Sequence, residues 1–112
     1  MITLVDDRPH PVERPEIVCI CGSMRFADEI RAANWAQTLA GRIVIAPGEA
    51  GQARESLTEE QKTALDQLHR HKIDLADRVL IVNPGGYIGR STSREIAYAR
   101  AIGKPISFTD PA

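Results

Sequence analysis

The chain has 112 residues, of which 43% are hydrophobic and 26% are charged, a composition typical of one globular domain and not of a disordered or fibrous segment. Its 14 Lys and Arg and 15 Asp and Glu give a formal net charge of −1, without the basic excess of a protein that binds a nucleic-acid polymer. The longest apolar runs are far shorter than a membrane span and no signal peptide is recognisable, so we expect a soluble, cytoplasmic protein without a membrane partner.

Metal and disulfide sites are not indicated by the sequence. The two cysteines, Cys19 and Cys21, lie two positions apart in an apolar segment, where strand geometry points both side chains the same way but does not favour a bridge between them. We therefore expect neither a disulfide framework nor a four-ligand zinc site. His69 and His71 are also two positions apart and would face differently on a helix, so we expect no metal and no cofactor.

The first 15 residues contain three prolines and mixed charges, which favours an N-terminal arm over residues 1–15. From residue 16 to residue 112, short apolar runs alternate with longer helical patterns. This alternation is typical of parallel βαβ units in a single domain.

The first predicted strand covers residues 17–21 and is apolar at every position, as in a strand covered on both faces. A helix is predicted over residues 27–40, where Gly41 provides a stop. The second strand covers residues 42–46. The glycine-containing loop over residues 48–56 is long enough to fold over the sheet end as a lid.

Thr58 and Gln61 match a capping box, which predicts a second helix that continues through Leu75. We then predict in chain order a strand, a glycine-containing loop, a helix and a last strand, over residues 79–82, 83–91, 92–102 and 105–108.

These elements predict an α/β fold: a single Rossmann-like domain with an open parallel sheet of about four strands in the order 2-1-3-4 and helices on both faces. Strands one and three would be neighbours, with their helices on opposite faces. The crevice beyond their carboxyl ends is where such sheets bind ligands. Both glycine-containing loops open there, so we predict a small-molecule site.

The loop after the first strand has features of an anion site. Gly22 and Ser23 can present backbone N–H groups, and Arg25 adds a positive charge, so a phosphate or a carboxylate would fit. The alternative is a tight strand-to-helix turn with Arg25 in solvent. Neither a complete GxGxxG pattern nor a Walker lysine is present, so the motifs do not support NAD or ATP.

Glu95 is the first candidate for chemistry, because helical spacing aligns it with Ala99 and Ile102 on the stripe predicted to face the sheet. One interpretation is a capping box, in which Glu95 bonds back to the backbone of Thr92. The other is a carboxylate nucleophile, or an electrostatic stabiliser of an oxocarbenium-like centre, as in the breaking of glycosidic bonds.

A carboxylate of this kind needs a proton donor for the leaving group. The candidates are His69, His71, Asp74 and Asp77. Asp74 and Asp77 lie near a helix C-terminus, where the helix dipole disfavours negative charge, although a solvated helix end would explain them as well. Tyr87 in the second loop could stack on a planar base or anchor its loop.

Three motifs in order carry a resemblance to a known family: Cys21-Gly22-Ser23-Met24-Arg25, residues 73–79, and residues 91–99 with 103–105. Together they resemble the nucleoside 2-deoxyribosyltransferase-like superfamily. The chain looks closest to its small bacterial and phage members and is similar to the deoxynucleoside 5′-monophosphate N-glycosidases. The resemblance implies cleavage or exchange of a base–sugar bond by a homodimer or higher homo-oligomer. It also implies a nucleophilic glutamate at Glu95 and loops that hold the sugar or its 5′-phosphate.

Three positions depart from that family pattern: His69 stands where an aspartate is usual, Cys19 where a tyrosine is frequent, and Gly89 where an aspartate or serine is usual. A second resemblance involves Pro84 to Tyr87 followed by Ser91 and Glu95. These residues look like a stretched version of the PGGxGTxxE motif of cytokinin-activating phosphoribohydrolases.

We therefore predict an N-glycosidase or 2-deoxyribosyltransferase that acts on a nucleoside or nucleotide, with Glu95 at the anomeric carbon and His69 or Asp77 as proton donor. The predicted substrate-binding residues are Gly22, Ser23, Met24, Arg25, Gly85, Gly86, Tyr87 and Ser91. The alternative is a noncatalytic nucleotide sensor that kept the pocket and lost the acid.

Overall fold

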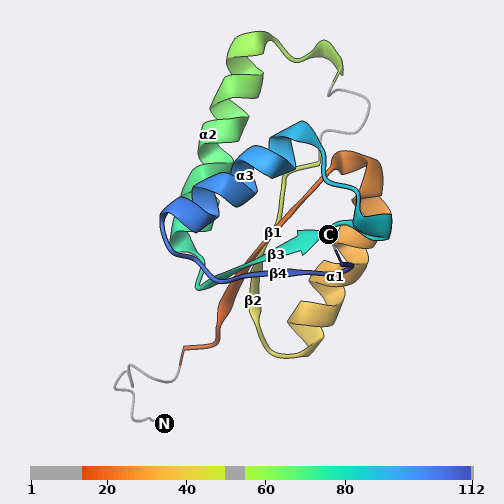
Figure 1. Cartoon of the computed structure of the whole chain (residues 1–112), viewed down its shortest axis with the longest axis vertical. Helices are drawn as coiled ribbons and strands as arrows, with labels where there is room; N and C mark the ends of the chain where they lie inside the picture. Colours follow the sequence, from red (N-terminus) through yellow and green to blue (C-terminus); the bar gives the residue numbers. More distant parts are fainter. Residues whose placement is uncertain (1–13, 50–54, 112) are drawn as a thin grey trace, which may run out of the picture.

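Four parallel strands form one sheet in the order β2-β1-β3-β4 in the computed structural model, which describes residues 14–49 and 55–111 (Figure 1). The strands are β1 Ile17–Gly22, β2 Ile43–Ile45, β3 Arg78–Val82 and β4 Ile106–Phe108. The predicted α/β class and strand order are confirmed. Most of the predicted N-terminal arm and residues 50–54 of the predicted lid lie outside the described residues.

The register of the two central strands places their carboxyl ends side by side. Val18 of β1 lies opposite Arg78 of β3, and the pairing continues to Gly22 opposite Val82. Because both strands end at the same level, the loops that follow them start next to each other at one edge of the sheet.

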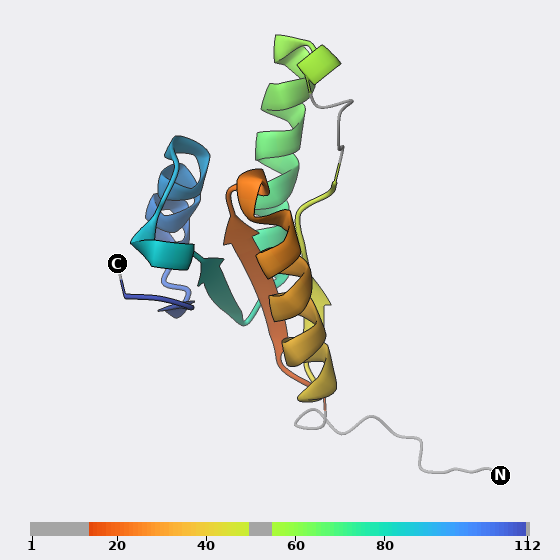
Figure 2. The ribbon, with the colours of Figure 1, turned by 90° about the vertical axis from the view of Figure 1, so that its right-hand side faces the viewer.

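Helices cover both faces of the sheet, as predicted. The helix α1 (Ala27–Leu39) lies on one side, and α2 (Glu59–Leu75) and α3 (Arg90–Ala101) lie on the other (Figure 1). The first turns of α2 extend past the end of the sheet (Figures 1 and 2). Two short 3-10 helices, η2 (Met24–Phe26) and η4 (Pro84–Gly86), belong to the loops after β1 and β3.

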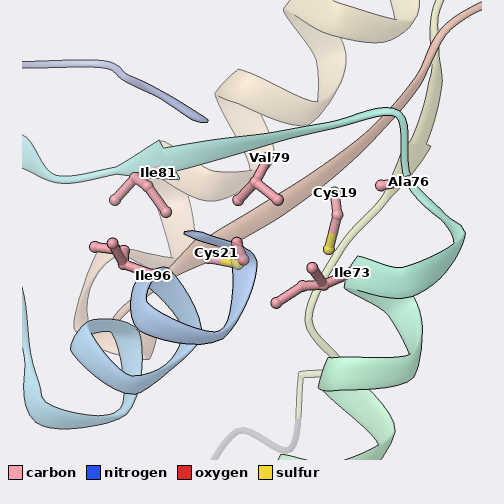
Figure 3. Packing of buried hydrophobic residues seen from close by; sticks show 8 residues of the cluster. Cys19, Cys21, Ile73, Ala76, Val79, Ile81 and Ile96 are labelled. Atoms are coloured by element: carbon pink, nitrogen blue, oxygen red, sulfur yellow. The ribbon is translucent and has the colours of Figure 1, made fainter. Parts of the chain in front are cut away.

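The core is divided by the sheet because successive side chains of a strand point to opposite faces. Val18 and Ile20 pack toward α1, with Ile30 of that helix. Cys19 and Cys21 point the other way, into the cluster with α2 and α3 that Figure 3 shows. Alternate residues of β1 therefore supply the two halves of the core.

The starts of the two helices on this second face differ in chemistry. The predicted capping box of α2 is confirmed, with Gln61 N donating to Thr58 Oγ1 at 3.0 Å and Thr58 N donating to Gln61 Oε1 at 2.9 Å. The capping box considered for Thr92 and Glu95 is wrong. The helix α3 begins two residues before Thr92, with Gly89 as N-cap, so Thr92 lies within the helix and is buried. The Glu95 side chain is thereby free of a capping role.

Within the described ranges, no helix combines the length and the apolar character that crossing a membrane requires.

Candidate active site

Side chains from three elements meet on the second face of the sheet: Cys19 and Cys21 from β1, His69 from α2 and Glu95 from α3. The His69 Nε2 atom lies 3.2 Å from Cys21 Sγ and 3.9 Å from Cys19 Sγ. The same nitrogen lies 3.8 Å from Glu95 Oε1. The imidazole is therefore the centre of the cluster, and we call these four side chains the Cys-His-Glu cluster.

Helix periodicity explains why His69 and Glu95 point inward. His69 precedes the fully buried Ile73 by one helical turn, and Glu95 precedes the fully buried Ala99 by one turn. Both side chains thus share the apolar stripe of their helix. The side chain of His69 is 9% exposed and that of Glu95 is 18% exposed, so the carboxylate is the member of this pair nearer to solvent.

Burial controls the charge of Glu95. Removal from water raises the pKa of Glu95 above its usual range, although His69 and a hydrogen bond with Cys21 act in the opposite direction. Burial lowers the pKa of His69, but Cys19 and Glu95 outweigh burial, and the net pKa is raised. A raised imidazole pKa favours the cation next to the carboxylate, so each group supports the charge of the other.

The two thiols behave differently although they are neighbours on one strand. The Cys21 thiol and His69 lower the pKa of Cys19 to about 6, against the effect of burial. Cys19 and burial both raise the pKa of Cys21. The pair thus favours one thiolate held by a neighbouring thiol and an imidazole.

The loops after β1 and β3 contact each other at the carboxyl edge of the sheet. The Arg25 guanidinium carbon lies 4.3 Å from the centre of the Tyr87 ring, in cation–π geometry. Phe26 meets the same ring edge-on, with centroids 5.7 Å apart. Ser23 caps η2 by accepting a hydrogen bond from Arg25 N. The two loops that the sequence places at this edge are therefore joined through Tyr87.

The remaining predicted binding residues have local roles in the structure. The backbone N–H of Gly85 donates to Asp110 Oδ2 at 2.7 Å, and that of Gly86 donates to the Asn83 carbonyl at 2.7 Å. Met24 packs against the core under α1, and Ser91 accepts from Arg94 at 3.4 Å. These amides and this hydroxyl already have protein partners.

Of the four proton-donor candidates, the structure brings His69 to Glu95. Asp77 lies at the opposite end of β1, where it binds Arg14 and accepts from Ile17 N at 2.8 Å. Asp74 accepts a hydrogen bond from Tyr98 at 2.6 Å, and its other oxygen lies 3.7 Å from the exposed His71. His69 thus lies next to Glu95, whereas Asp77 lies at the amino edge of β3.

Sequence reasoning missed that both cysteines contact His69. Spacing along the chain relates Cys19 to Cys21 and His69 to His71, whereas the partners in the structure come from different elements. One signal was available: the strand places both thiols on one face, and the position of His69 one turn before Ile73 predicts an inward imidazole. The ligand atoms of the two cysteines and His69 lie within 4.8 Å of one another, which is close enough to hold a metal ion.

Two hollows of the surface lie away from this cluster. One, of about 330 Å³, is lined by the first turns of α2, from Glu59 to Gln67. The other, of about 410 Å³, lies between α1 and the chain that follows β3 and β4, with Val82, Pro84 and Asp110 in its wall. Neither is lined by Glu95 or His69.

Comparison with solved structures shows what the fold is similar to. No protein-family model matches the sequence, and no curated protein matches it. A solved structure of a 2-deoxyribosyltransferase from the psychrotolerant bacterium Bacillus psychrosaccharolyticus, described as a biocatalyst for the synthesis of nucleosides, is similar with a TM-score of 0.61. The likeness covers 82% of this chain and 70% of that chain, at 16% sequence identity. The chain therefore shares the fold of a 2-deoxyribosyltransferase.

Proposed function

We propose that the protein cleaves or exchanges the N-glycosidic bond of a nucleoside or nucleotide, with Glu95 as the attacking carboxylate. The observation that carries the proposal is the position of Glu95: a carboxylate 18% exposed, on the helix that follows β3, held 3.8 Å from a buried imidazole. The fold shared with a 2-deoxyribosyltransferase supports the class of bond.

The reaction needs a carboxylate that attacks the anomeric carbon. Glu95 Oε would form a bond to C1′ while the C1′–N bond breaks, and the base departs with that electron pair and takes up a proton. Water then hydrolyses the glycosyl ester and returns the carboxylate. A second base could instead attack C1′, and the sugar would be transferred.

The geometry favours a positioning role for His69 and differs from the proton-donor role expected from the sequence. A leaving base departs from the face of C1′ opposite to the nucleophile. The imidazole is the more buried member of the pair, with Nε2 3.8 Å from Glu95 Oε1 and 3.2 Å from Cys21 Sγ. We therefore assign His69 to orienting Glu95 and stabilising its charge. Asp77, bonded to Arg14 at the other end of β1, receives no role in the reaction.

The joined loops supply the contacts that a nucleotide needs. Arg25 offers a cation for a phosphate, and its stacking on Tyr87 fixes that cation at the sheet edge. Tyr87 is 42% exposed, so its ring can also border a base. Ser23 keeps its hydroxyl at the start of η2, where it can meet a sugar or phosphate oxygen.

The test is a survey of substrates with a matched pair of variants. Wild type, Glu95→Gln and the control Glu60→Gln are incubated with ribo- and deoxynucleosides and their 5′-monophosphates, with and without an acceptor base, and free base is followed by chromatography. Glu60 lies on the exposed first turn of α2. We expect release by wild type and Glu60→Gln, and a loss on the order of 10³-fold or more for Glu95→Gln.

Equal release by wild type and Glu95→Gln would overturn the assignment of Glu95. No release from any member of the panel, with a chelator present, would overturn the catalytic proposal and favour the nucleotide-sensor alternative, which calorimetry with the same panel then tests.

A further inference from the structure

We propose that the Cys-His-Glu cluster binds one thiophilic divalent cation, Zn²⁺, through Cys19, Cys21 and His69, with Glu95 as the fourth ligand. This site stands on the geometry of the cluster and does not depend on the proposed function.

The spacing of the ligand atoms fits a tetrahedral ion. With Zn–S bonds of about 2.3 Å and Zn–N bonds of about 2.0–2.1 Å, a tetrahedral site places sulfur and nitrogen about 3.6 Å apart. The two observed sulfur–nitrogen distances, 3.2 and 3.9 Å, lie on either side of that value. The Glu95 oxygen lies 3.8 Å from His69 Nε2 but outside the group of three mutually close ligand atoms, so its side chain would have to turn toward the ion to take the fourth position.

The kind of ligand selects the kind of ion. Thiolate and imidazole ligands favour Zn²⁺ and related soft or borderline ions over Mg²⁺ and Ca²⁺, which prefer oxygen. Both thiols are fully buried and the imidazole is nearly so. A metal ion gives such buried ligands the charge compensation that a packed apolar core does not.

The surroundings suit an ion that enters from the side of Glu95. The Glu95 side chain is more exposed than that of His69, and both thiols are fully buried. Two thiolates, one carboxylate and Zn²⁺ leave one negative charge. Lys72 on α2 acts electrostatically on both Cys19 and His69, so it offsets part of that charge.

Occupancy has a consequence for the reaction, and this step alone rests on the proposed function. Zn²⁺ bound at the cluster uses His69 Nε2 and the Glu95 carboxylate, the two groups that the proposed attack requires. The loaded protein is therefore expected to release no base until a chelator removes the ion.

The direct test is a titration of chelator-treated protein with Co²⁺, which takes tetrahedral sites and has visible absorption. The chain contains two cysteines, so thiolate-to-metal charge transfer reports on Cys19 and Cys21 alone. We expect one Co²⁺ per chain, a charge-transfer band, the visible bands of a tetrahedral ion, and loss of all of them when one equivalent of Zn²⁺ is added.

Matched variants locate the site. His69→Gln should weaken binding more than about 100-fold, because even residues that only support a ligand contribute roughly 10- to 100-fold. His71→Gln, the exposed histidine of the same helix, should bind as wild type does. Cys21→Ser should reduce the charge-transfer band, and His69→Gln remains a test if the serine variant does not fold, as judged by circular dichroism.

Absence of a charge-transfer band in folded wild type at excess Co²⁺ would overturn the metal site, as would equal affinities of His69→Gln and wild type. These readouts involve no substrate. A protein that binds Co²⁺ but releases no base even after a chelator has removed the ion contradicts the proposed function only, and one that releases base without binding Co²⁺ contradicts the metal site only.

Discussion

His69 Nε2 lies 3.8 Å from Glu95 Oε1, although the two residues belong to different helices. Both α2 and α3 pack on one face of the sheet, and Cys21 of β1 lies beneath the pair, 3.2 Å from the same nitrogen. The contact thus joins two helices and the central strand at one point. An ionisable pair in such a place has its charge governed by burial and by its partner, which is a frequent property of functional sites.

The role of His69 can be separated from that of a proton donor by changing the leaving group. We expect His69→Gln to lower kcat roughly 10²-fold through misplacement of Glu95. The loss should be equal for a guanine nucleoside and its N7-methylated form, whose base departs without protonation. Base release is measured with a chelator present, so that metal content is the same in all samples.

His71→Gln serves as control, since His71 is exposed and lies next to Asp74. If His69→Gln spared the N7-methylated nucleoside and impaired the unmodified one, His69 would be the proton donor and the positioning role would be refuted.

Gly22 is required by the close approach of β1 and β3. A Cβ added at Gly22 would lie 2.9 Å from the backbone oxygen of Val82 and 3.4 Å from Ile30 Cδ1. Because a backbone atom cannot rotate away, we expect Gly22→Ala to lower the free energy of unfolding by roughly 1–3 kcal/mol. Denaturant titration of wild type and Gly22→Ala measures this difference in the free energy of unfolding.

The control is Gly48→Ala, where an added Cβ meets no atom within 4 Å. We expect this variant to unfold like wild type. Equal stability of Gly22→Ala and Gly48→Ala would show that the ends of β1 and β3 separate without cost.

Asn83 connects the end of β3 to the C-terminal segment and is fully buried. Its side-chain nitrogen donates to the Asp110 carbonyl at 3.0 Å, and its side-chain oxygen accepts from Asp110 N at 3.0 Å. Asn83→Ala leaves both backbone groups without these partners. We expect this variant to lower the free energy of unfolding, measured by denaturant titration, by about 1–3 kcal/mol. A decrease below a few tenths of a kcal/mol would contradict this account.

The contact of Asp77 with Arg14 predicts a stability change in acid. A hydrogen bond from Arg14 and one from the Ile17 amide lower the pKa of Asp77 to about 2. This folded-state value lies below the ordinary value of about 3.9. The ionised carboxylate therefore stabilises the fold fully above about pH 4, and this contribution is lost as pH falls through about 2.

Thermal unfolding of wild type and Asp77→Asn over this pH range tests the expectation. The difference in Tm should be constant above about pH 4 and should shrink toward about pH 2. In an Arg14→Gln background, the difference in Tm that Asp77→Asn causes should be smaller. The part that remains is due to the hydrogen bond from the Ile17 amide. A difference that does not change with pH would refute the depressed pKa of Asp77.

Most of the fold follows from local sequence patterns. The wholly apolar run over residues 17–21 indicates a strand covered on both faces, and Thr58 with Gln61 marks the start of α2. The start of α3 was predicted two residues late, because Thr92 resembles an N-cap more than Gly89 does. Short-range patterns cannot decide between two such starts when packing of a buried threonine favours one of them.

The candidate site was predictable in part. The inward position of Glu95 follows from its spacing to Ala99, and the meeting of the two loops follows from the strand order. The contacts of His69 with both cysteines do not follow, because they depend on the angle at which α2 crosses β1. The binding of Gly85 N–H to Asp110 likewise depends on where the C-terminal segment packs.

The attack of Glu95 on the anomeric carbon is tested most directly by trapping the glycosyl ester. A nucleoside with fluorine at C2′, carrying the base that the substrate survey identifies, should release one equivalent of base and then stop, because the fluorine slows hydrolysis of the ester. Mass spectrometry should find the fluorinated sugar on the peptide that contains Glu95 in wild type, and no adduct in Glu95→Gln. Release of base with no sugar attached, or attachment at another residue, would contradict Glu95 as the nucleophile.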